Sequence, residues 1–251
     1  MRNLSSLLTV LALSFSSIAA IGCATDPLDT SDTADESAGT GKFELWQTAD
    51  GWRFHLKSGN GAILLASESY TDRTGAINGI LSVTNNGIDP AQYRVVPATH
   101  GYLLHLVAAN NEIISFSEVY ATKASATRAV TSCVRASTSY LDKRAAISTG
   151  ARVEVDASSG GFHFDVFAKN GQVVMTSEHY TTEAAAYNGA FAVQDTTATY
   201  TVRANASGGF YFTVTAQNGQ IVGTSQQYST QASAQAGATA AQALIKTISI
   251  L

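Results

Sequence analysis

Hydrophobic and polar residues alternate in four short segments of this chain, and each segment leads into a second apolar stretch. In the first segment the apolar positions are Trp52, Phe54 and Leu56. A period of two with one apolar face predicts a half-buried β-strand. The same alternation recurs at residues 102–106, 162–166 and 210–214, and a further strand is predicted before each segment, at 43–48, 93–97, 152–156 and 200–203.

An Asn stands nine residues after the Gly that opens each segment, and a Tyr follows ten residues later. Gly61, Gly171 and Gly219 follow three of these Asn residues, and Asn111 follows the remaining one. Asn-Gly accepts the positive φ angles of a type I′ turn, so we expect four type I′ hairpins. They lead into third strands at 63–67, 113–117, 173–177 and 221–225, and the fixed spacing defines four copies of one unit.

A helix is predicted at the end of each copy. Two residues beyond each Tyr stands a side chain suited to cap a helix N-terminus, namely Asp72, Thr122, Thr182 or Thr230. The Ala-rich stretches that follow, such as 123–135 and 231–246, place small apolar residues at helical spacing. Each copy therefore reads strand-strand-strand-helix, which predicts an α+β fold of antiparallel sheets with helices on one face.

The recurring strings of the first copy resemble the YegP-like family of short tandem repeats. They are Lys42-Phe43-Glu44-Leu45, the stretch 50–61, Ser67-Glu68-Ser69-Tyr70 and Asn78-Gly79-Ile80. The resemblance implies that two repeats share one antiparallel sheet, with the strand after each helix exchanged between them. It implies no activity and no catalytic residue. Extra length around 136–150 separates two pairs, 42–147 and 148–251, and we expect the two pairs to fold separately.

The N-terminus has the order of an export signal. Arg2, the apolar run 7–15 and the small residues 16–20 predict a signal peptide over 1–22. Ala20-Ile21-Gly22-Cys23 resembles the lipobox of bacterial lipoproteins and predicts lipidation of Cys23; the alternative is an ordinary signal peptide cut after Ala20 or Ala24. The acidic stretch 23–41 predicts a flexible tether. We therefore expect a membrane-anchored lipoprotein of the cell envelope, with a periplasmic or secreted protein as the alternative.

Net charge and the length of the apolar runs limit which partners the chain is expected to bind. A net charge of -4 leaves no excess of Lys and Arg to neutralise phosphates, so no nucleic-acid partner is expected. No apolar run is long enough to cross a bilayer, so membrane attachment would depend on the lipid alone.

Once Cys23 is lipidated or removed, Cys133 is the only thiol and no internal disulfide is expected. Cys133 aligns with Val83, Val193 and Ala241, which predicts a small buried side chain.

The search for chemistry finds no catalytic motif and no cofactor site. Ser-Glu-x-Tyr recurs from Ser67, Ser117 and Ser177, but its place at a strand end favours a structural role over a nucleophile. His163 and Asp165 lie two residues apart on one strand face. They would hold a metal ion only if a neighbouring strand supplied further ligands, so no metal is expected.

Apolar residues on the face opposite the core suggest an interaction surface. This candidate interaction face comprises Trp46, Leu103, Val107 and Phe167, and the alternative is that neighbouring segments cover them. The leading hypothesis is a non-catalytic interaction or structural repeat module whose protein or glycan partner is unidentified. A second hypothesis is an exported enzyme with a site formed between repeats by His163, Asp165 and Glu178. A third is a passive envelope component without a ligand.

Overall fold

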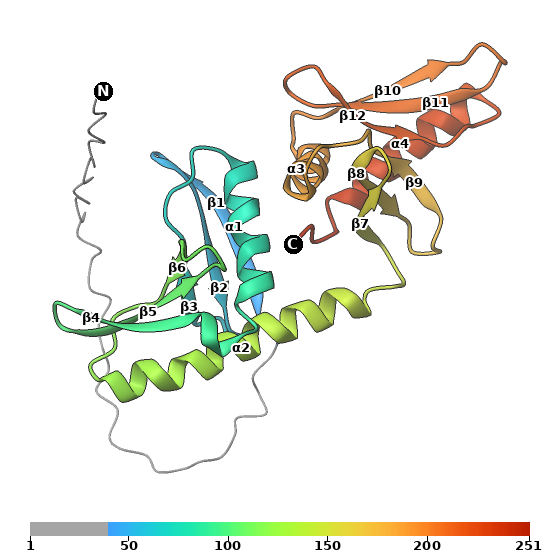
Figure 1. Ribbon diagram of the computed structural model, residues 1–251. Coiled ribbons are helices and arrows are strands. Elements are labelled where there is room, and N and C mark those ends of the chain that lie inside the picture. The colour runs from blue at the N-terminus through green and yellow to red at the C-terminus, as the bar shows by residue number, and fades with distance from the viewer. Residues whose placement is uncertain (1–39) are drawn as a thin grey trace, which may run out of the picture. The chain divides into compact units, whose positions relative to one another are not determined.

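The computed structural model describes residues 40–251, which form four strand-strand-strand-helix units (Figure 1). The predicted fold class is therefore confirmed. The predicted signal peptide, Cys23 and all of the predicted tether before residue 40 lie outside the described residues. The strands are β1 (Lys42–Thr48), β2 (Gly51–Lys57), β3 (Ile63–Ala66), β4 (Tyr93–Ala98), β5 (Gly101–Val107), β6 (Ile113–Phe116), β7 (Arg152–Ser158), β8 (Gly161–Phe167), β9 (Val173–Thr176), β10 (Thr199–Ala204), β11 (Phe210–Thr215) and β12 (Ile221–Ser225). The helices are α1 (Arg73–Asn86), the short 3₁₀ helix η1 (Pro90–Gln92), α2 (Lys123–Ala146), α3 (Glu183–Gln194) and α4 (Gln231–Ile245).

The strands form two six-stranded antiparallel sheets. Their orders are β1-β2-β3-β6-β5-β4 and β10-β11-β12-β9-β8-β7, so each sheet takes its strands from one predicted pair. The strands that follow α1 and α3, β4 and β10, are the first strands of the second and fourth copies and pair with β5 and β11 of those same copies. The strand that follows α2, β7, lies in the other sheet, so the expected exchange of the strand after each helix is not seen.

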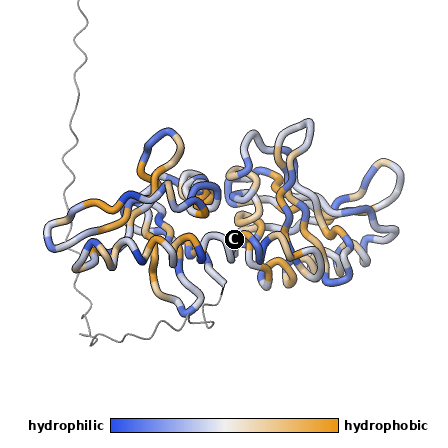
Figure 2. Tube along the Cα trace, turned by 60° about the horizontal axis from the view of Figure 1, so that its bottom comes forward, coloured by the Kyte–Doolittle hydropathy of each residue, from blue (hydrophilic) through white to orange (hydrophobic). Residues whose placement is uncertain are grey.

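Hydrophobic and polar residues alternate along stretches of the strands (Figure 2), and this alternation gives each sheet a core face and an outer face. In the first pair, Phe54, Leu56 and Leu104 point to the core and pack with Ile80 of α1 and Cys133 of α2. All five side chains are fully buried. The intervening strand residues point the other way, and we call the side of the sheet that they form the outer face of each copy. Among residues 40–251, no helix is long and apolar enough to span a membrane.

The predicted N-caps are confirmed in all four helices. The side chain of Asp72 accepts a hydrogen bond from the backbone N–H of Gly75. Thr122, Thr182 and Thr230 accept the equivalent bond at the start of their own helices. Each cap satisfies one of the backbone donors that a helix start leaves unpaired, which explains why a side-chain oxygen stands at this position in every copy.

The predicted type I′ turns are wrong. A type I′ turn needs positive φ at two successive residues, but only one residue of each turn has it, at φ 90 for Gly61, 67 for Asn111, 80 for Gly171 and 83 for Gly219. The Gly61 N–H bonds to Ser58 O, and the Ser58 N–H bonds to Ala62 O, which is the pattern of a turn closed by a left-handed residue. The preceding Asn60 uses its side chain instead, because its Oδ1 accepts from the Ala62 N–H at 3.1 Å.

Helix α2 is longer than the sequence pattern predicted. It continues from Lys123 to Ala146 and includes the polar stretch placed at the boundary between the pairs. One side of that stretch is buried: Tyr140 is 6% exposed and its ring meets Phe43 edge-on at 4.9 Å. The extra residues are therefore a helical extension packed on β1 rather than a linker, and separate folding of the two pairs stays a prediction.

Candidate functional site

A buried Ser near the end of the third strand holds two strands together in every copy. Ser177 Oγ accepts a hydrogen bond from the Phe164 N–H at 2.8 Å and donates one to Glu178 O at 2.7 Å. Ser67, Ser117 and Ser225 make the same pair of bonds in their copies, and all four residues are at most 8% exposed. The Ser of the recurring Ser-Glu-x-Tyr motif is therefore a structural link, as predicted, and is not available as a nucleophile.

The lone thiol among the described residues is equally inaccessible. Cys133 is fully buried, and burial raises the pKa of its thiol to about 12. A thiol with that pKa stays protonated at neutral pH and is a poor nucleophile and metal ligand. Its repeat counterparts Val83, Val193 and Ala241 are also buried, at 2% exposure or less, so the predicted packing role is confirmed.

The copies differ where three residues meet on the outer face. Two of the three are cross-strand partners on the first and second strands, and the third lies two residues further along the second strand. We call these three residues the outer triad of a copy. The outer triads are Trp46, Arg53 and His55 in the first copy, Val96, Leu103 and His105 in the second, Asp156, His163 and Asp165 in the third, and Arg203, Tyr211 and Thr213 in the fourth.

In three copies the side chains of the outer triad contact or hydrogen-bond one another, or two of the three are apolar. The Trp46 ring lies 4.4 Å from the His55 ring, and burial lowers the pKa of His55. Burial also lowers the pKa of His105, whose triad partners are Val96 and Leu103. In the fourth copy Arg203 Nε donates to Thr213 Oγ1 at 3.0 Å.

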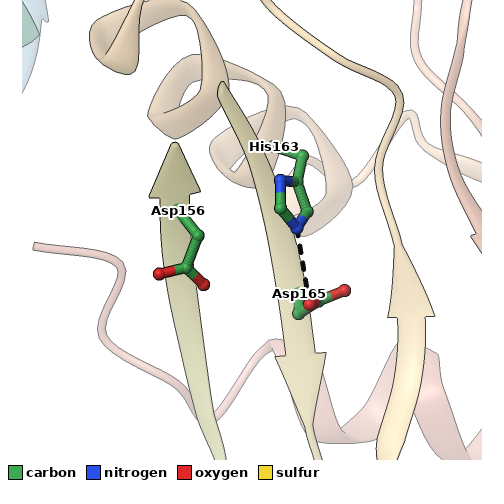
Figure 3. Close-up of side chains that lie close together, drawn as sticks. All are labelled: Asp156, His163 and Asp165. Carbon is green, nitrogen blue, oxygen red and sulfur yellow. Dashed lines mark ion pairs between the residues drawn. The ribbon is translucent and has the colours of Figure 1, made fainter. Parts of the chain in front are cut away.

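The third copy instead brings together three groups that can bind a metal ion (Figure 3). One ligand atom from each of Asp156, His163 and Asp165 lies within 4.8 Å of the other two. His163 Nε2 lies 3.7 Å from Asp165 Oδ2, and these two side chains are 21% and 19% exposed. Figure 3 shows Asp156 on one strand and the other two residues on the neighbouring strand.

The sequence analysis named two of these three residues as potential ligands but expected no metal there. His163 and Asp165 share a strand face as expected, and Asp156 of β7 supplies the neighbouring ligand that the sequence pattern required. Within residues 40–251, this cluster of potential ligands does not include Glu178, which was expected beside His163 in the enzyme hypothesis. The signal that points to Asp156 is the two-residue turn at 159–160, because that turn sets Asp156 opposite His163.

The residues of the candidate interaction face do not form one patch. Trp46 on β1 and Leu103 on β5 are separated by three strands, and Phe167 lies in the other sheet. The Arg152 guanidinium covers Phe167, 3.9 Å from its ring centre. Val107 is only 3% exposed, and a register shift between Leu106 and Val107 interrupts the simple alternation that placed it outward. Phe167 and Val107 are therefore covered by neighbouring residues, as the alternative interpretation of this face expected.

Exposed apolar side chains do recur at a position that the sequence analysis missed. Ile63, Ile113 and Ile221 are 47%, 46% and 42% exposed. Each is the first residue of a third strand, directly after the hairpin turn. The recurrence of Ile at this repeat position was the available signal, but these residues were assigned to the third strands without a statement of their exposure.

The family comparison agrees with the repeat structure. The sequence model described as "Domain of unknown function (DUF1508)" matches residues 48–93, 101–139, 157–203 and 205–245, which is more than half of the chain. The chain belongs to the DUF1508 family. Each of the four matches contains the second and third strands of one copy and all or most of its helix, so the predicted resemblance to the YegP-like repeats is confirmed.

Similar proteins carry the same label of unknown function. The chain is 44% identical over 62 residues to the UPF0339 protein YegP of Escherichia coli K12, a match that covers 24% of this chain and 56% of that protein. It is 46% identical over 55 residues to the UPF0339 protein in the ptx operon 5′ region of Stutzerimonas stutzeri, covering 22% and 50%. The chain thus spans about half the length of these relatives. A UPF0339 protein of Treponema denticola is 39% identical over 56 residues, and here 97% of the relative is covered.

Two solved structures are similar to parts of the chain. The solution structure of Escherichia coli yegP, a protein of unknown function, is 39% identical, with a TM-score of 0.38 and coverage of 40% of this chain and 88% of that chain. The solution structure of a UPF0339 protein from Shewanella oneidensis is 35% identical, with a TM-score of 0.37 and coverage of 39% and 85%.

Proposed function

We propose that the chain is an exported, lipid-anchored protein of the bacterial cell envelope whose repeats form a non-catalytic interaction module. The observation that carries this proposal is that the recurring residues and the differing residues of each copy have separate roles. Residues that recur in all four copies, such as Ser177 and the N-cap Thr182, bond to the backbone. Residues that differ between copies meet in the outer triads.

Such a division favours binding over catalysis. A repeat protein that keeps one framework and varies one face presents several different surfaces from a single architecture, which is how repeat proteins build binding surfaces. The two nucleophile types that the sequence raised are occupied or buried, since Ser177 is hydrogen-bonded through its Oγ and Cys133 is fully buried. An enzyme with a site between repeats would need reactive side chains from different copies to lie close together. The cluster of potential metal ligands found among residues 40–251, Asp156, His163 and Asp165, comes from the third copy alone.

Export and anchoring rest on the N-terminal sequence. The signal-like residues 1–22 and the lipobox-like Ala20-Ile21-Gly22-Cys23 support a lipid on Cys23, and the acidic stretch 23–41 supports a tether between lipid and repeats. A single acyl chain gives only marginal membrane binding, whereas the several chains of a lipoprotein anchor hold a protein firmly at a bilayer.

The anchor is tested by replacing its cysteine. In cells that express the full chain, Cys23→Ser should move the protein from the membrane fraction to the soluble fraction and abolish incorporation of labelled fatty acid. The reason is that the lipid is attached through the Cys23 thiol and the described residues offer no membrane-spanning helix. Immunoblots of fractions washed with high salt measure the distribution.

Cys133→Ala is the matched control, because it removes the buried thiol and keeps Cys23. It should leave both the membrane fraction and the fatty-acid label unchanged. If Cys23→Ser protein still pellets with membranes after the salt wash, the anchor is somewhere else and this part of the proposal fails.

A further inference from the structure

We propose that the outer triad of the third copy, Asp156, His163 and Asp165, binds a divalent transition-metal ion such as Zn²⁺. This inference goes beyond the proposed interaction role, because it assigns a specific ligand to one copy. Three donors converge from two adjacent strands, and their ligand atoms all lie within 4.8 Å of one another. Zinc bonds of about 2.0 Å place tetrahedral ligand atoms roughly 3.3 Å apart, so small side-chain rotations bring this triad to bonding distance.

The strands themselves hold the donors in place. Asp156 lies directly opposite His163 in the β7–β8 register, and His163 and Asp165 are two residues apart on β8. Both relations place side chains on the same face of the sheet at short range. The site is therefore built on paired strands rather than on loops, which limits the rearrangement needed for binding.

A hydrogen bond from the next strand orients one of the carboxylates. Thr176 of β9 stands opposite Asp165, and its Oγ1 donates to Asp165 Oδ1 at 2.5 Å. This bond occupies one carboxylate oxygen and leaves the other, Oδ2, beside His163 Nε2. Hydrogen bonds of this kind commonly hold metal-binding carboxylates in their binding orientation.

The charges around the triad favour a cation. Among the ion pairs of residues 40–251, none joins Asp156 or Asp165 to a Lys or Arg side chain. By contrast Glu154, which faces Asp165 across the strands, is paired with Arg152 at 2.5 Å. His163 makes no hydrogen bond through its ring in this part of the chain, and its buried Nδ1 has no partner. Two carboxylates without a Lys or Arg partner, beside an imidazole whose Nε2 lies 3.7 Å from Asp165 Oδ2, form a donor set that a divalent ion would complete.

The other copies show that the framework does not require these residues. At the positions of Asp156 and His163, the first copy has Trp46 and Arg53, and the fourth has Arg203 and Tyr211. A cationic side chain at either position would repel a metal ion. The second copy has the apolar Val96 and Leu103 at the same positions, so the metal-binding set occurs in the third copy and in none of the other three.

The donor types indicate the class of metal. Imidazole nitrogen with carboxylate oxygen suits Zn²⁺, Ni²⁺, Cu²⁺ and Fe²⁺, whereas Mg²⁺ and Ca²⁺ prefer oxygen ligands alone. Three protein ligands leave at least one coordination position of a tetrahedral ion open to water or to a group from a partner. The His179 ring lies 5.4 Å from the His163 ring.

Titration of the full-length, chelator-treated protein with ZnCl₂ in a calorimeter tests the proposal. We expect saturable binding of one zinc ion per chain that excess Mg²⁺ does not displace. His163→Gln and Asp156→Asn should each weaken binding by at least about 10-fold, and Thr176→Val by about 10-fold, since removal of a supporting bond typically has this effect. Replacing Zn²⁺ with Co²⁺ adds visible d–d absorption bands whose intensity reports the coordination geometry of the bound ion.

Two matched variants control for non-specific binding. Glu154→Gln removes a neighbouring carboxylate of β7, and His105→Gln removes an imidazole from the outer triad of the second copy. Both should leave the zinc affinity unchanged within about 2-fold. Thermal unfolding by circular dichroism confirms that each variant is folded. The absence of saturable zinc binding, displacement by Mg²⁺, or binding that His163→Gln leaves intact would each overturn the proposal.

Discussion

Ser177→Ala is expected to lower the free energy of unfolding by about 1–3 kcal/mol, because it leaves the Phe164 N–H and Glu178 O without their buried partner. Ser177 is 8% exposed, so water replaces the lost bonds only in part. The same change at Ser67, Ser117 or Ser225 should have an effect of the same size, since the bonds are repeated in each copy. Denaturant unfolding of the full chain, followed by circular dichroism, measures the loss.

Ser148→Ala is the control, because Ser148 is exposed and its side chain makes no hydrogen bond in the described structure. It should change the free energy of unfolding by no more than about 0.5 kcal/mol. If Ser177→Ala unfolds at the same denaturant concentration as the unmodified protein, the Ser does not link the strands and its recurrence needs another explanation.

Gly189→Ala is expected to destabilise the protein by about 1–3 kcal/mol, although the same change in an open helix usually stabilises it by about 1 kcal/mol. A Cβ at Gly189 would lie 2.2 Å from Tyr180 Oη and 3.1 Å from the Phe164 ring. The Tyr180 ring is stacked on Phe164, with centroids 6.4 Å apart, so it cannot move aside without disturbing the core. The sign of the change measured by denaturant unfolding therefore decides whether the contact matters.

The second copy shows how the clash is avoided. Copies one, three and four combine a core Phe with a helical Gly, whereas the second copy combines Leu104 with Ala129. The smaller Leu leaves room for the Tyr ring to move away from the added methyl group. Phe164→Leu combined with Gly189→Ala should therefore be more stable than the sum of the two single changes predicts, by about 0.5–3 kcal/mol. Strict additivity, or a stabilising Gly189→Ala, would contradict this account of the packing.

Local signals in the sequence were sufficient to predict the elements of the fold. Strand periodicity at Trp52, Phe54 and Leu56 and the cap at Asp72 depend on residues close in the chain, and both predictions are confirmed. The fourfold spacing strengthened them, because one pattern that recurs four times is hard to produce by chance. The length of α2 was missed because its buried side, including Tyr140, is small and lies within a polar stretch.

Predictions that depended on backbone detail failed. The Asn-Gly sequence is compatible with more than one turn type, and here the Asn60 side chain bonds to the Ala62 N–H while only Gly61 takes positive φ. Val107 was placed outward by strict alternation, but the irregular register next to Leu106 breaks that rule. Neither feature leaves a signal in the order of polar and apolar residues.

Only part of the candidate site was accessible from sequence. His163 and Asp165 share a strand, so their common face follows from periodicity alone. Asp156 joins them through the pairing of two strands, and Thr176 joins through a third. Such contacts require the register of the whole sheet, which the hairpin turns set and which a search along one strand does not reveal.

The central claim is that one framework carries different side chains, with different chemistry, on the outer face of each copy. Exchanging the outer-triad residues between the third and fourth copies and measuring the number of zinc ions bound per chain tests this claim. The fourth copy is a suitable recipient, because Thr224 stands opposite Thr213 as Thr176 stands opposite Asp165. Arg203→Asp, Tyr211→His and Thr213→Asp together should add a second zinc site to the chain. The reverse exchange, Asp156→Arg, His163→Tyr and Asp165→Thr, should abolish zinc binding while the protein stays folded. A stoichiometry that remains the same in both folded variants would contradict the claim.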